Sequence, residues 1–281
     1  MAELIELEPQ LRLAAFISLF VVMAIWEIAA PRRPLSINKA YRWANNLGLV
    51  VVNSLLVRAL FPTAAVGVAL FAQSKGWGLF NWIGFNGQEW SGAAPVILSI
   101  VLLDFAIWGQ HLLFHVVPFF WRVHRVHHAD LDLDLSSGLR FHPVEILLSM
   151  VIKAGIILLL GPPAVAVLLF EILLNATSMF NHSNVRLPLV VDHLLRWIIV
   201  TPDMHRVHHS WITEETNSNY GFNLTWWDRL LGTYRPQPAA GHLDMTIGTH
   251  QFRDRGDLRL DRMLVQPLSG DQQNLSSTEI R

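Results

Sequence analysis

Residues 144–180, VEILLSMVIKAGIILLLGPPAVAVLLFEILLNATSMF, form a long apolar stretch with Gly161-Pro162-Pro163 near its centre. Two prolines after a glycine stop a helix, because proline lacks the backbone N–H and clashes with the preceding turn. Each half has about 17 residues and would be about 25 Å long as a helix. The stretch therefore predicts a membrane hairpin whose two ends lie on the same side of the bilayer.

Three further apolar runs precede the hairpin, at 11–30, 46–72 and 94–118. A run of about 20 apolar residues can cross a bilayer core of about 30 Å. We interpret all three runs as membrane spans, although Arg58 and Pro62 interrupt the second. A cleavable signal peptide is the weaker interpretation of the first run, because acidic residues precede it where a signal peptide is basic.

The composition also indicates an integral membrane protein. Of the 281 residues, 52% are hydrophobic and 15% are charged, and the mean hydropathy is +0.35. The predicted fold class is all-α, with about three transmembrane helices, the Gly-Pro-Pro-broken hairpin and a cytoplasmic histidine-rich cap. The net charge of −1 gives no reason to expect a nucleic-acid partner. Cysteine is absent, so a metal would have to be held by His, Asp, Glu or Asn.

Composition and charge suggest three parts and an orientation. The predicted parts are N-terminal membrane helices at 1–93, a histidine-rich domain at 94–240, and a cytoplasmic C-terminal segment at 241–281 that ends in a disordered tail. Basic residues between 31 and 43 place that loop in the cytoplasm by the positive-inside rule. The N-terminus is then outside, and both 119–143 and the chain after the hairpin are cytoplasmic. Residues 189–200 are too short to span and predict an interfacial amphipathic helix.

The pentapeptide HRVHH occurs twice, at 124–128 and 205–209. Ten histidines have spacings typical of metal ligands, namely His111, His115, His124, His127, His128, His142, His182, His205, His208 and His209. A single histidine is more often a polar contact to a carbonyl, which is the interpretation that we keep for His193, His242 and His250. Clustered imidazoles at one membrane face instead indicate a metal site. Because one ion takes three or four imidazoles, the set predicts two ions, of iron, zinc, copper or nickel.

Nearby polar residues are expected to orient the imidazoles rather than to bind the metal. The candidates for this supporting position are Asp104, Glu145, Asp203 and Asn219. Asp104 lies seven residues before His111 and hence on the same helical face. Asp130, Asp132 and Asp134 are interpreted as part of a solvated loop.

The histidine motifs, H-x3-H at 111–115 and H-x2-H-H at 124–128 and 205–209, resemble those of the fatty acid hydroxylase/sterol desaturase superfamily. RFHPVE at 140–145, NHSN at 181–184 and NYGFNLTWWDRLLGTYRP at 219–236 resemble further motifs of that family. The resemblance covers roughly residues 94–240. It implies an O2-dependent oxidoreductase with a membrane-embedded di-iron centre. Such an enzyme hydroxylates or desaturates a C–H bond of a lipid, which is sterol-like, fatty acyl or an aminolipid.

The resemblance further implies a ligand set, cofactors and partners. The family's three histidine boxes correspond here to His111, His115, His124, His127, His128, His205, His208 and His209. Where some members carry a further H-x3-H, this chain has Ser178 and His182, and His142 is a candidate to complete the set. The implied cofactors are two iron ions, for which zinc can substitute in purified protein, with O2 as co-substrate. The implied partners are a lipid and an electron donor, such as a ferredoxin or a cytochrome b5-like carrier with its reductase.

Other function classes fit the sequence less well. The alternative is a histidine-rich membrane metal-binding or transport protein without oxygenase activity, but a transport path needs polar residues through the whole membrane depth. A zinc hydrolase typically carries H-E-x-x-H, which is absent. Arg122, Arg125 and Arg206 either dock an acidic electron carrier or are solvated charges.

Overall fold

The computed structural model describes residues 7–61, 63–85 and 92–270. These residues form helices and loops with three isolated β-bridges and no strand. Five stretches are long and apolar enough to cross a membrane, namely Glu8–Ala29, Lys39–Trp82, Ala93–Val116, Pro143–Leu160 and Ala164–Asn181. The prediction of an all-α integral membrane protein is thereby confirmed. Most of the predicted disordered tail lies at 271–281, outside the described residues.

The hairpin consists of helices α8 (Pro143–Leu160) and α9 (Ala164–Asn181). α8 ends where Gly161 adopts φ 62° and ψ 47°, a left-handed conformation that favours glycine. A Cβ at Gly161 would also lie 2.5 Å from the carbonyl oxygen of Trp77. The turn therefore forms at the Gly-Pro-Pro sequence, as predicted, and glycine is required there for two separate reasons.

The second expected span, 46–72, is not one helix. It is divided between α3 (Lys39–Leu60) and α4 (Ala64–Lys75). The sequence has Pro62 between them, and proline cannot continue a helix because it lacks the N–H donor. Small residues such as Ala65 let α4 pack against both α8 and α9. α4 therefore covers the hairpin instead of extending α3.

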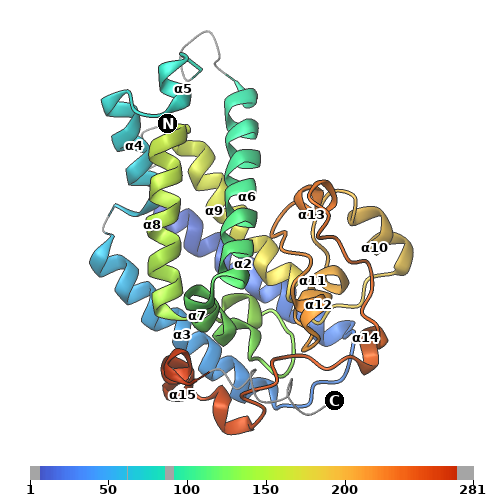
Figure 1. Cartoon of the computed structure of the whole chain (residues 1–281). Coiled ribbons are helices and arrows are strands. Elements are labelled where there is room, and N and C mark those ends of the chain that lie inside the picture. Colours follow the sequence, from blue (N-terminus) through green and yellow to red (C-terminus); the bar gives the residue numbers. More distant parts are fainter. Residues whose placement is uncertain (1–6, 62, 86–91, 271–281) are drawn as a thin grey trace, which may run out of the picture.

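The remaining long helices, α2 (Glu8–Ala29) and α6 (Ala93–Val116), both pack against α9. Figure 1 shows α6 and α8 standing side by side, with the α10–α14 part of the chain (189–244) beside the lower half of α6, on the side away from α8. α6 is followed at once by α7 (Pro118–His128), which begins at a proline that favours a first helical turn. The two histidine-bearing helices α6 and α7 thus meet next to the α10–α14 part.

The other helices are short and are joined by irregular loops. They are α5 (Leu79–Trp82), α10 (Leu189–Leu195), α11 (Pro202–His208), α12 (Thr213–Thr216), α13 (Trp226–Leu230), α14 (Gly241–Asp244) and α15 (Leu260–Val265). α11 carries most of the second HRVHH and packs against α9, and its His208 ring contacts the His128 ring on α7.

Helix α10 is shorter than the expected helix at 189–200 but has the expected two faces. Asp192 and Arg196 form a buried ion pair of 2.7 Å on its inner side. On its outer side Leu194 is 62% exposed, and the neighbouring Leu189 is 77% exposed. An apolar outer face over a polar inner face is the reverse of a water-soluble helix, and it fits a location at a membrane interface.

The aspartates after the first HRVHH are buried, so their interpretation as a solvated loop was wrong. Arg42 on α3 is fully buried and donates to Asp130 at 2.7 and 2.9 Å and to Asp134 at 2.6 Å. Asp132 accepts from backbone N–H groups at 36–37. Although burial alone would raise it, Arg42 holds the pKa of Asp130 well below its usual range. This ion-pair network joins α3 to the loop that follows the first HRVHH.

Candidate metal centre

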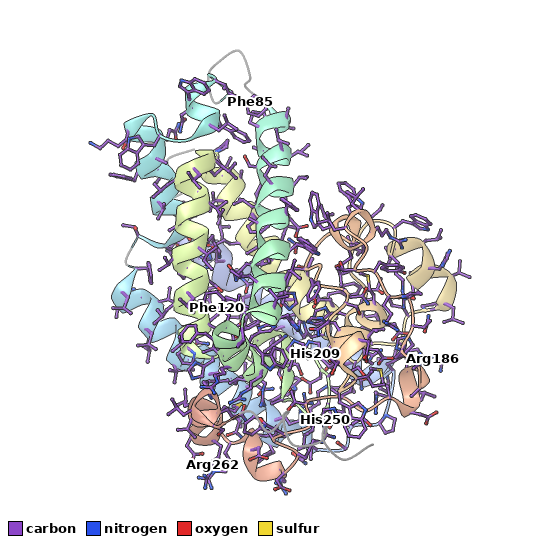
Figure 2. The ribbon with its side chains drawn as sticks, viewed as in Figure 1. Phe85, Phe120, Arg186, His209, His250 and Arg262 are labelled. Carbon is purple, nitrogen blue, oxygen red and sulfur yellow. The ribbon has the colours of Figure 1, made fainter. Side chains whose placement is uncertain are left out.

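Nine histidines form two groups, each of which could hold a metal ion. The five-histidine group consists of His111, His115, His124, His128 and His208. The four-histidine group consists of His127, His182, His205 and His209. Within each group the candidate ligand nitrogens all lie within 4.8 Å of one another, and all the rings are buried except that of His115, which is half-buried. Figure 2 shows His209 at the junction of the long helices and the α10–α14 part.

The repeated pentapeptide explains how two groups arise. On α7, His124 and His128 are one turn apart and join the five-histidine group, whereas His127 joins the other group. In the second HRVHH the arrangement is exchanged, because its first and last histidines join the four-histidine group and His208 joins the five-histidine group. Each group therefore takes ligands from both copies.

The long helices supply the remaining members. His111 and His115 are one turn apart near the end of α6, and His182 directly follows α9. Ser178, one turn before His182, donates from Oγ to the carbonyl of Gly138 at 2.6 Å. A Cβ at Gly138 would collide with the carbonyl of Ser178, so glycine permits this close approach. Ser178 therefore fixes the 137–139 turn against α9.

Hydrogen bonds at Nδ1 determine the tautomers in the five-histidine group. Nδ1 of His111 lies 2.8 Å from the carbonyl of Tyr220, and Nδ1 of His208 lies 2.7 Å from the carbonyl of Ser218. A carbonyl can only accept, so both rings carry the proton on Nδ1 and a lone pair on Nε2. The two Nε2 atoms are 3.0 Å apart, so their lone pairs face each other. Such an arrangement suits a cation that both nitrogens can bind.

The four-histidine group has the same pattern. Nδ1 of His127 donates to the carbonyl of Arg140 at 3.2 Å, and Nδ1 of His182 donates to the carbonyl of Ser178 at 2.8 Å. Their Nε2 atoms are 3.0 Å apart, and Nε2 of His205 is 3.0 Å from that of His182. Three imidazole nitrogens therefore converge, and this donor set fits a metal ion that prefers imidazole.

Burial keeps these rings neutral. It lowers the pKa of His124 and of His182 to about 3. The pKa of His209 is also lowered, mainly by burial and secondly by the neighbouring His127. At neutral pH the imidazoles are therefore unprotonated, and their lone pairs are available for a metal.

One carboxylate contacts the histidines directly. Glu145, in the first turn of α8, accepts a hydrogen bond at Oε1 from Nδ1 of His124 at 2.7 Å. This contact leaves the lone pair of His124 on Nε2, which lies 3.1 Å from Nε2 of His111. Glu145 thus has the geometry of a carboxylate that orients a metal-binding imidazole.

The other three predicted supporting residues hold segments of chain rather than imidazole rings. Asp104 accepts from backbone N–H groups and an indole of the 223–227 segment. Asp203 forms ion pairs with Arg32 and Arg206. Asn219 donates to two carbonyls and lies in the left-handed region, at φ 53°. In the part of the chain that is described, none of the three contacts a ring of either group.

The structure adds a supporting residue that sequence reasoning missed. Asp228 accepts from the backbone N–H groups of Tyr220 and Gly221 and from the indole of Trp108, at 2.8–3.0 Å. It thereby holds the carbonyl of Tyr220 against His111. The WDR sequence marked this aspartate as part of a family motif, but the carbonyl that it positions has no signal in the sequence.

His142 does not join either group. Its Nδ1 accepts from the N–H of Val144 at 3.2 Å, and its Nε2 lies 3.2 Å from the carbonyl of Leu264. Both ring nitrogens are therefore occupied by contacts that cap α8 and hold the C-terminal segment. His193, His242 and His250 also lie outside the two groups.

Two of the three arginines considered for docking an electron carrier are buried. Arg125 is 2% exposed and donates to the carbonyls of Gln266 and Ser269, both at 2.6 Å. Arg206 is 1% exposed and pairs with Asp203. These two side chains hold the fold together and do not face a partner, whereas Arg122 is exposed.

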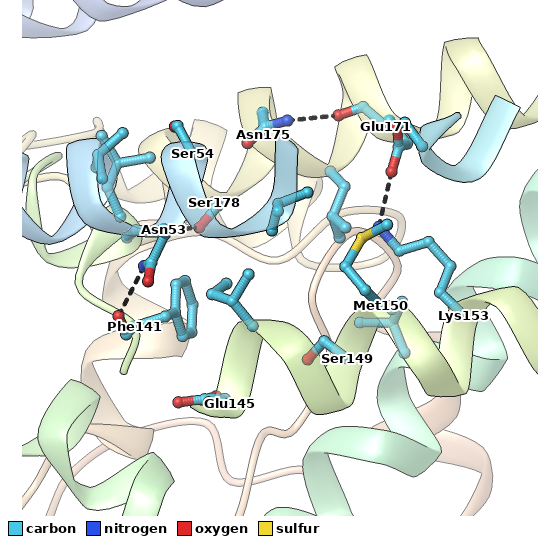
Figure 3. A pocket seen from close by; sticks show the side chains of 18 of the residues that line it. Asn53, Ser54, Phe141, Glu145, Ser149, Met150, Lys153, Glu171, Asn175 and Ser178 are labelled. Atoms are coloured by element: carbon cyan, nitrogen blue, oxygen red, sulfur yellow. Dashed lines mark hydrogen bonds and ion pairs between the residues drawn. The ribbon is translucent and has the colours of Figure 1, made fainter. Parts of the chain in front are cut away.

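A cavity of about 700 Å³ reaches the five-histidine group. His111 and His124 line it, whereas the described residues that line it include no member of the four-histidine group. Figure 3 shows the cavity between α8 and α9, with Glu145 and Ser149 along α8 and Ser178 on α9. Much of its wall is apolar, so a hydrocarbon chain could reach the histidines.

The comparisons with known proteins agree with this geometry. Residues 96–233, which contain all nine grouped histidines, match the fatty acid hydroxylase family model. This region of the chain belongs to the fatty acid hydroxylase/sterol desaturase superfamily. No solved structure matches the chain.

Curated members of the superfamily resemble about three fifths of the chain. The ornithine lipid hydroxylase OlsE of Rhizobium tropici is 33% identical over 58% of this chain and 48% of its own length. The alkylglycerol monooxygenase of Danio rerio is 30% identical over 62% of this chain and 39% of its own length. The cholesterol 25-hydroxylase of Rattus norvegicus is 28% identical over 58% of this chain and 53% of its own length. The chain thus spans about half, or less, of the length of these relatives.

Proposed function

We propose that this protein is a membrane-bound di-iron oxygenase that uses O2 and external electrons to hydroxylate or desaturate a C–H bond of a lipid. The observation that carries the proposal is the pair of histidine groups with converging lone pairs, one of which lines an apolar cavity. The relatives support it, because their names describe hydroxylases and monooxygenases of lipids and a sterol. They give no support to metal transport.

In this proposal the five-histidine group holds one iron and the four-histidine group holds the other. Iron accepts imidazole ligands readily, and zinc can replace it in purified protein. Bound iron would supply the activation of O2. Hydroxylation converts a C–H bond, O2, two electrons and two protons into C–OH and one water, whereas desaturation yields C=C and two waters.

The protein's own residues orient the imidazole rings and exclude water from the cavity. The carbonyls of Tyr220 and Ser218 fix two rings of the five-histidine group, and Glu145 fixes a third. The apolar wall of the cavity keeps water away and holds the lipid C–H bond next to His111 and His124. Substrate position then decides which bond is attacked, because reaction needs near-contact geometry.

The electrons come from outside in this proposal, since the chain has no cysteine to hold an iron–sulfur cluster. We assign them to a ferredoxin or a cytochrome b5-like carrier with its reductase. The catalytic part is assigned to 94–240. The N-terminus is placed outside and the histidine groups at the cytoplasmic face, on the basis of the basic residues between 31 and 43.

The metal content of the detergent-purified protein tests the proposal first. Elemental mass spectrometry should find close to two irons per chain, and substitution of His208 by Ala should lower that number. Membranes that contain the active protein should incorporate one atom from ¹⁸O2 into a lipid, or form a lipid with two hydrogens fewer. A folded protein without any bound metal would overturn the assignment.

A further inference from the structure

The end of the cavity away from the histidines is lined by five charged side chains, namely Glu8, Arg12, Arg58, Lys153 and Glu171. Four of them form a continuous chain of ion pairs. Nη1 of Arg12 lies 2.9 Å from Glu8 and 2.8 Å from Glu171, and Nζ of Lys153 lies 2.8 Å from Glu171. Figure 3 shows Lys153 on α8 pointing toward Glu171 on α9. Charged residues inside membrane-spanning helices are costly and therefore usually functional.

These ion pairs leave donors free on the cavity side. Glu171 contacts a cation with each carboxylate oxygen, and its side chain is only 5% exposed. Arg12 is 33% exposed and makes both of its ion pairs through Nη1, so within the described residues its Nε and Nη2 have no partner. Lys153 uses one of three N–H donors in the same described region. The carboxylate is thus shielded, while Arg12 and Lys153, which both line the cavity, keep N–H groups without a partner in the described region.

The charge balance at this end is positive. Three cations and two carboxylates line it, so the net formal charge is +1. Arg58, the third cation, is exposed on α3. In a cavity with largely apolar walls, free N–H donors and a positive charge favour an anionic group that can accept several hydrogen bonds.

We propose that Arg12, Lys153 and Arg58 bind the anionic head of the lipid substrate, a carboxylate or a phosphate, while its alkyl part extends to the five-histidine group. This inference rests on the proposed function. Lys153 is eight positions after Glu145 on α8, which corresponds to a rise of about 12 Å. The oxidised carbon therefore lies about 12 Å from the head, within the hydrocarbon chain rather than beside the head group.

Other lipid heads fit this end of the cavity less well. A cationic head would meet a net positive charge, and like charges in a poorly hydrated site disfavour binding. An uncharged alcohol could accept from only one or two donors and would leave the remaining N–H groups of Arg12 and Lys153 without a partner.

Equilibrium binding to the purified full-length protein in a nonionic detergent tests the head-group preference. The probes share one chain length and differ only in the head: hexadecanoate, hexadecyl phosphate, hexadecanol and hexadecylamine. The anions should bind at least about tenfold more tightly than the alcohol, as expected for charge-assisted hydrogen bonds. If only hexadecanoate binds tightly, the head that this end recognises is that of a fatty acid. If only hexadecyl phosphate does, it is that of a phospholipid. Equal affinity for the alcohol, or tighter binding of the amine, would overturn the proposal.

Variants locate the effect at the charged end. Lys153→Gln should weaken hexadecanoate binding about tenfold and leave hexadecanol binding nearly unchanged. Lys75→Gln, at the exposed end of α4 and outside the cavity lining, is the matched control and should change neither. Arg58→Gln removes an exposed cation without a buried ion pair, so it tests the same point if Lys153→Gln does not fold. Equal losses for the anion and the alcohol would mean that these residues serve structure alone.

Iron content, measured on the same preparations, separates the two proposals. Anion-selective binding by a folded protein without any bound metal would overturn the oxygenase and leave an anionic lipid site. Two irons without any preference for anionic heads would overturn the head-group site and leave the oxygenase.

Discussion

The two histidine groups are built from the same pentapeptide but have different surroundings. The five-histidine group lines the cavity through His111 and His124, and Glu145 contacts one of its rings. The four-histidine group also takes members from both copies of HRVHH, yet the described residues that line the cavity include none of its members. Backbone carbonyls of Arg140 and Ser178 orient two of its rings. Two copies of one pentapeptide, each divided between the groups, thus form two inequivalent sites, because different elements pack against each group.

This difference assigns different tasks to the two groups. Among the described residues that line the cavity, the grouped histidines are all members of the five-histidine group, so we expect the substrate C–H bond to lie there. The four-histidine group is enclosed by α7, α9, α11 and the loop after the first HRVHH. Its integrity should therefore depend on the fold of that loop more than on the cavity.

Loss of one ligand from either group should have the largest effect. His208→Ala removes a nitrogen from the five-histidine group, and His205→Ala removes one from the four-histidine group. Each should lower turnover by more than about 100-fold, because even partners of metal ligands typically contribute 10–100-fold. Elemental mass spectrometry should find about one iron fewer per chain in each variant. If either substitution removed both irons, the groups would be one coupled site and the comparison would fail.

Arg42→Ala should act mainly on the four-histidine group. It leaves Asp130 and Asp134 buried without their cation, which typically lowers the free energy of unfolding by about 3–5 kcal/mol. Arg42 also bonds Ser137, so the loop that presents the Arg140 carbonyl to His127 would lose its support. Thermal unfolding in detergent measures the effect.

The matched control for that substitution is Arg262→Ala, which changes an exposed arginine on α15. It should leave the unfolding temperature within error of the parent protein. An Arg42→Ala protein as stable as this control, with full iron content, would mean that the buried network does not support the four-histidine group.

Glu145→Ala should act on the five-histidine group alone. It removes the only carboxylate that the described contacts place on a grouped histidine, and turnover should fall about 10–100-fold. Glu145→Gln retains an acceptor for Nδ1 of His124 and should lose much less. Turnover and iron content of the two variants show whether Glu145 orients the His124 ring or only fills buried space. Equal losses in both would show that the negative charge matters, rather than the hydrogen bond.

Local sequence patterns were sufficient to predict much of the structure of this molecule. The Gly161 turn and the long apolar helices could be predicted because each depends on neighbouring residues in the sequence. Nine of the ten candidate histidines lie in the two groups, and their role as metal ligands stays a prediction. The Arg42–Asp130 pair could not be predicted, since its members are 88 residues apart and aspartates near glycine and serine usually indicate an exposed loop. The carbonyl of Tyr220, 109 residues from His111, was also hidden because any residue type carries a carbonyl.

The smallest effect is expected at His142, and it sharpens the comparison at the two ends of the hairpin. His142 and His182 flank α8 and α9 symmetrically in the sequence, but only His182 belongs to a group. His142→Ala should lose an N-cap hydrogen bond worth about 1 kcal/mol and should keep its iron and most of its turnover. His182→Ala should lose iron from the four-histidine group. Loss of iron in both variants would return His142 to the ligand set, and it would mean that the C-terminal segment moves when the metal binds.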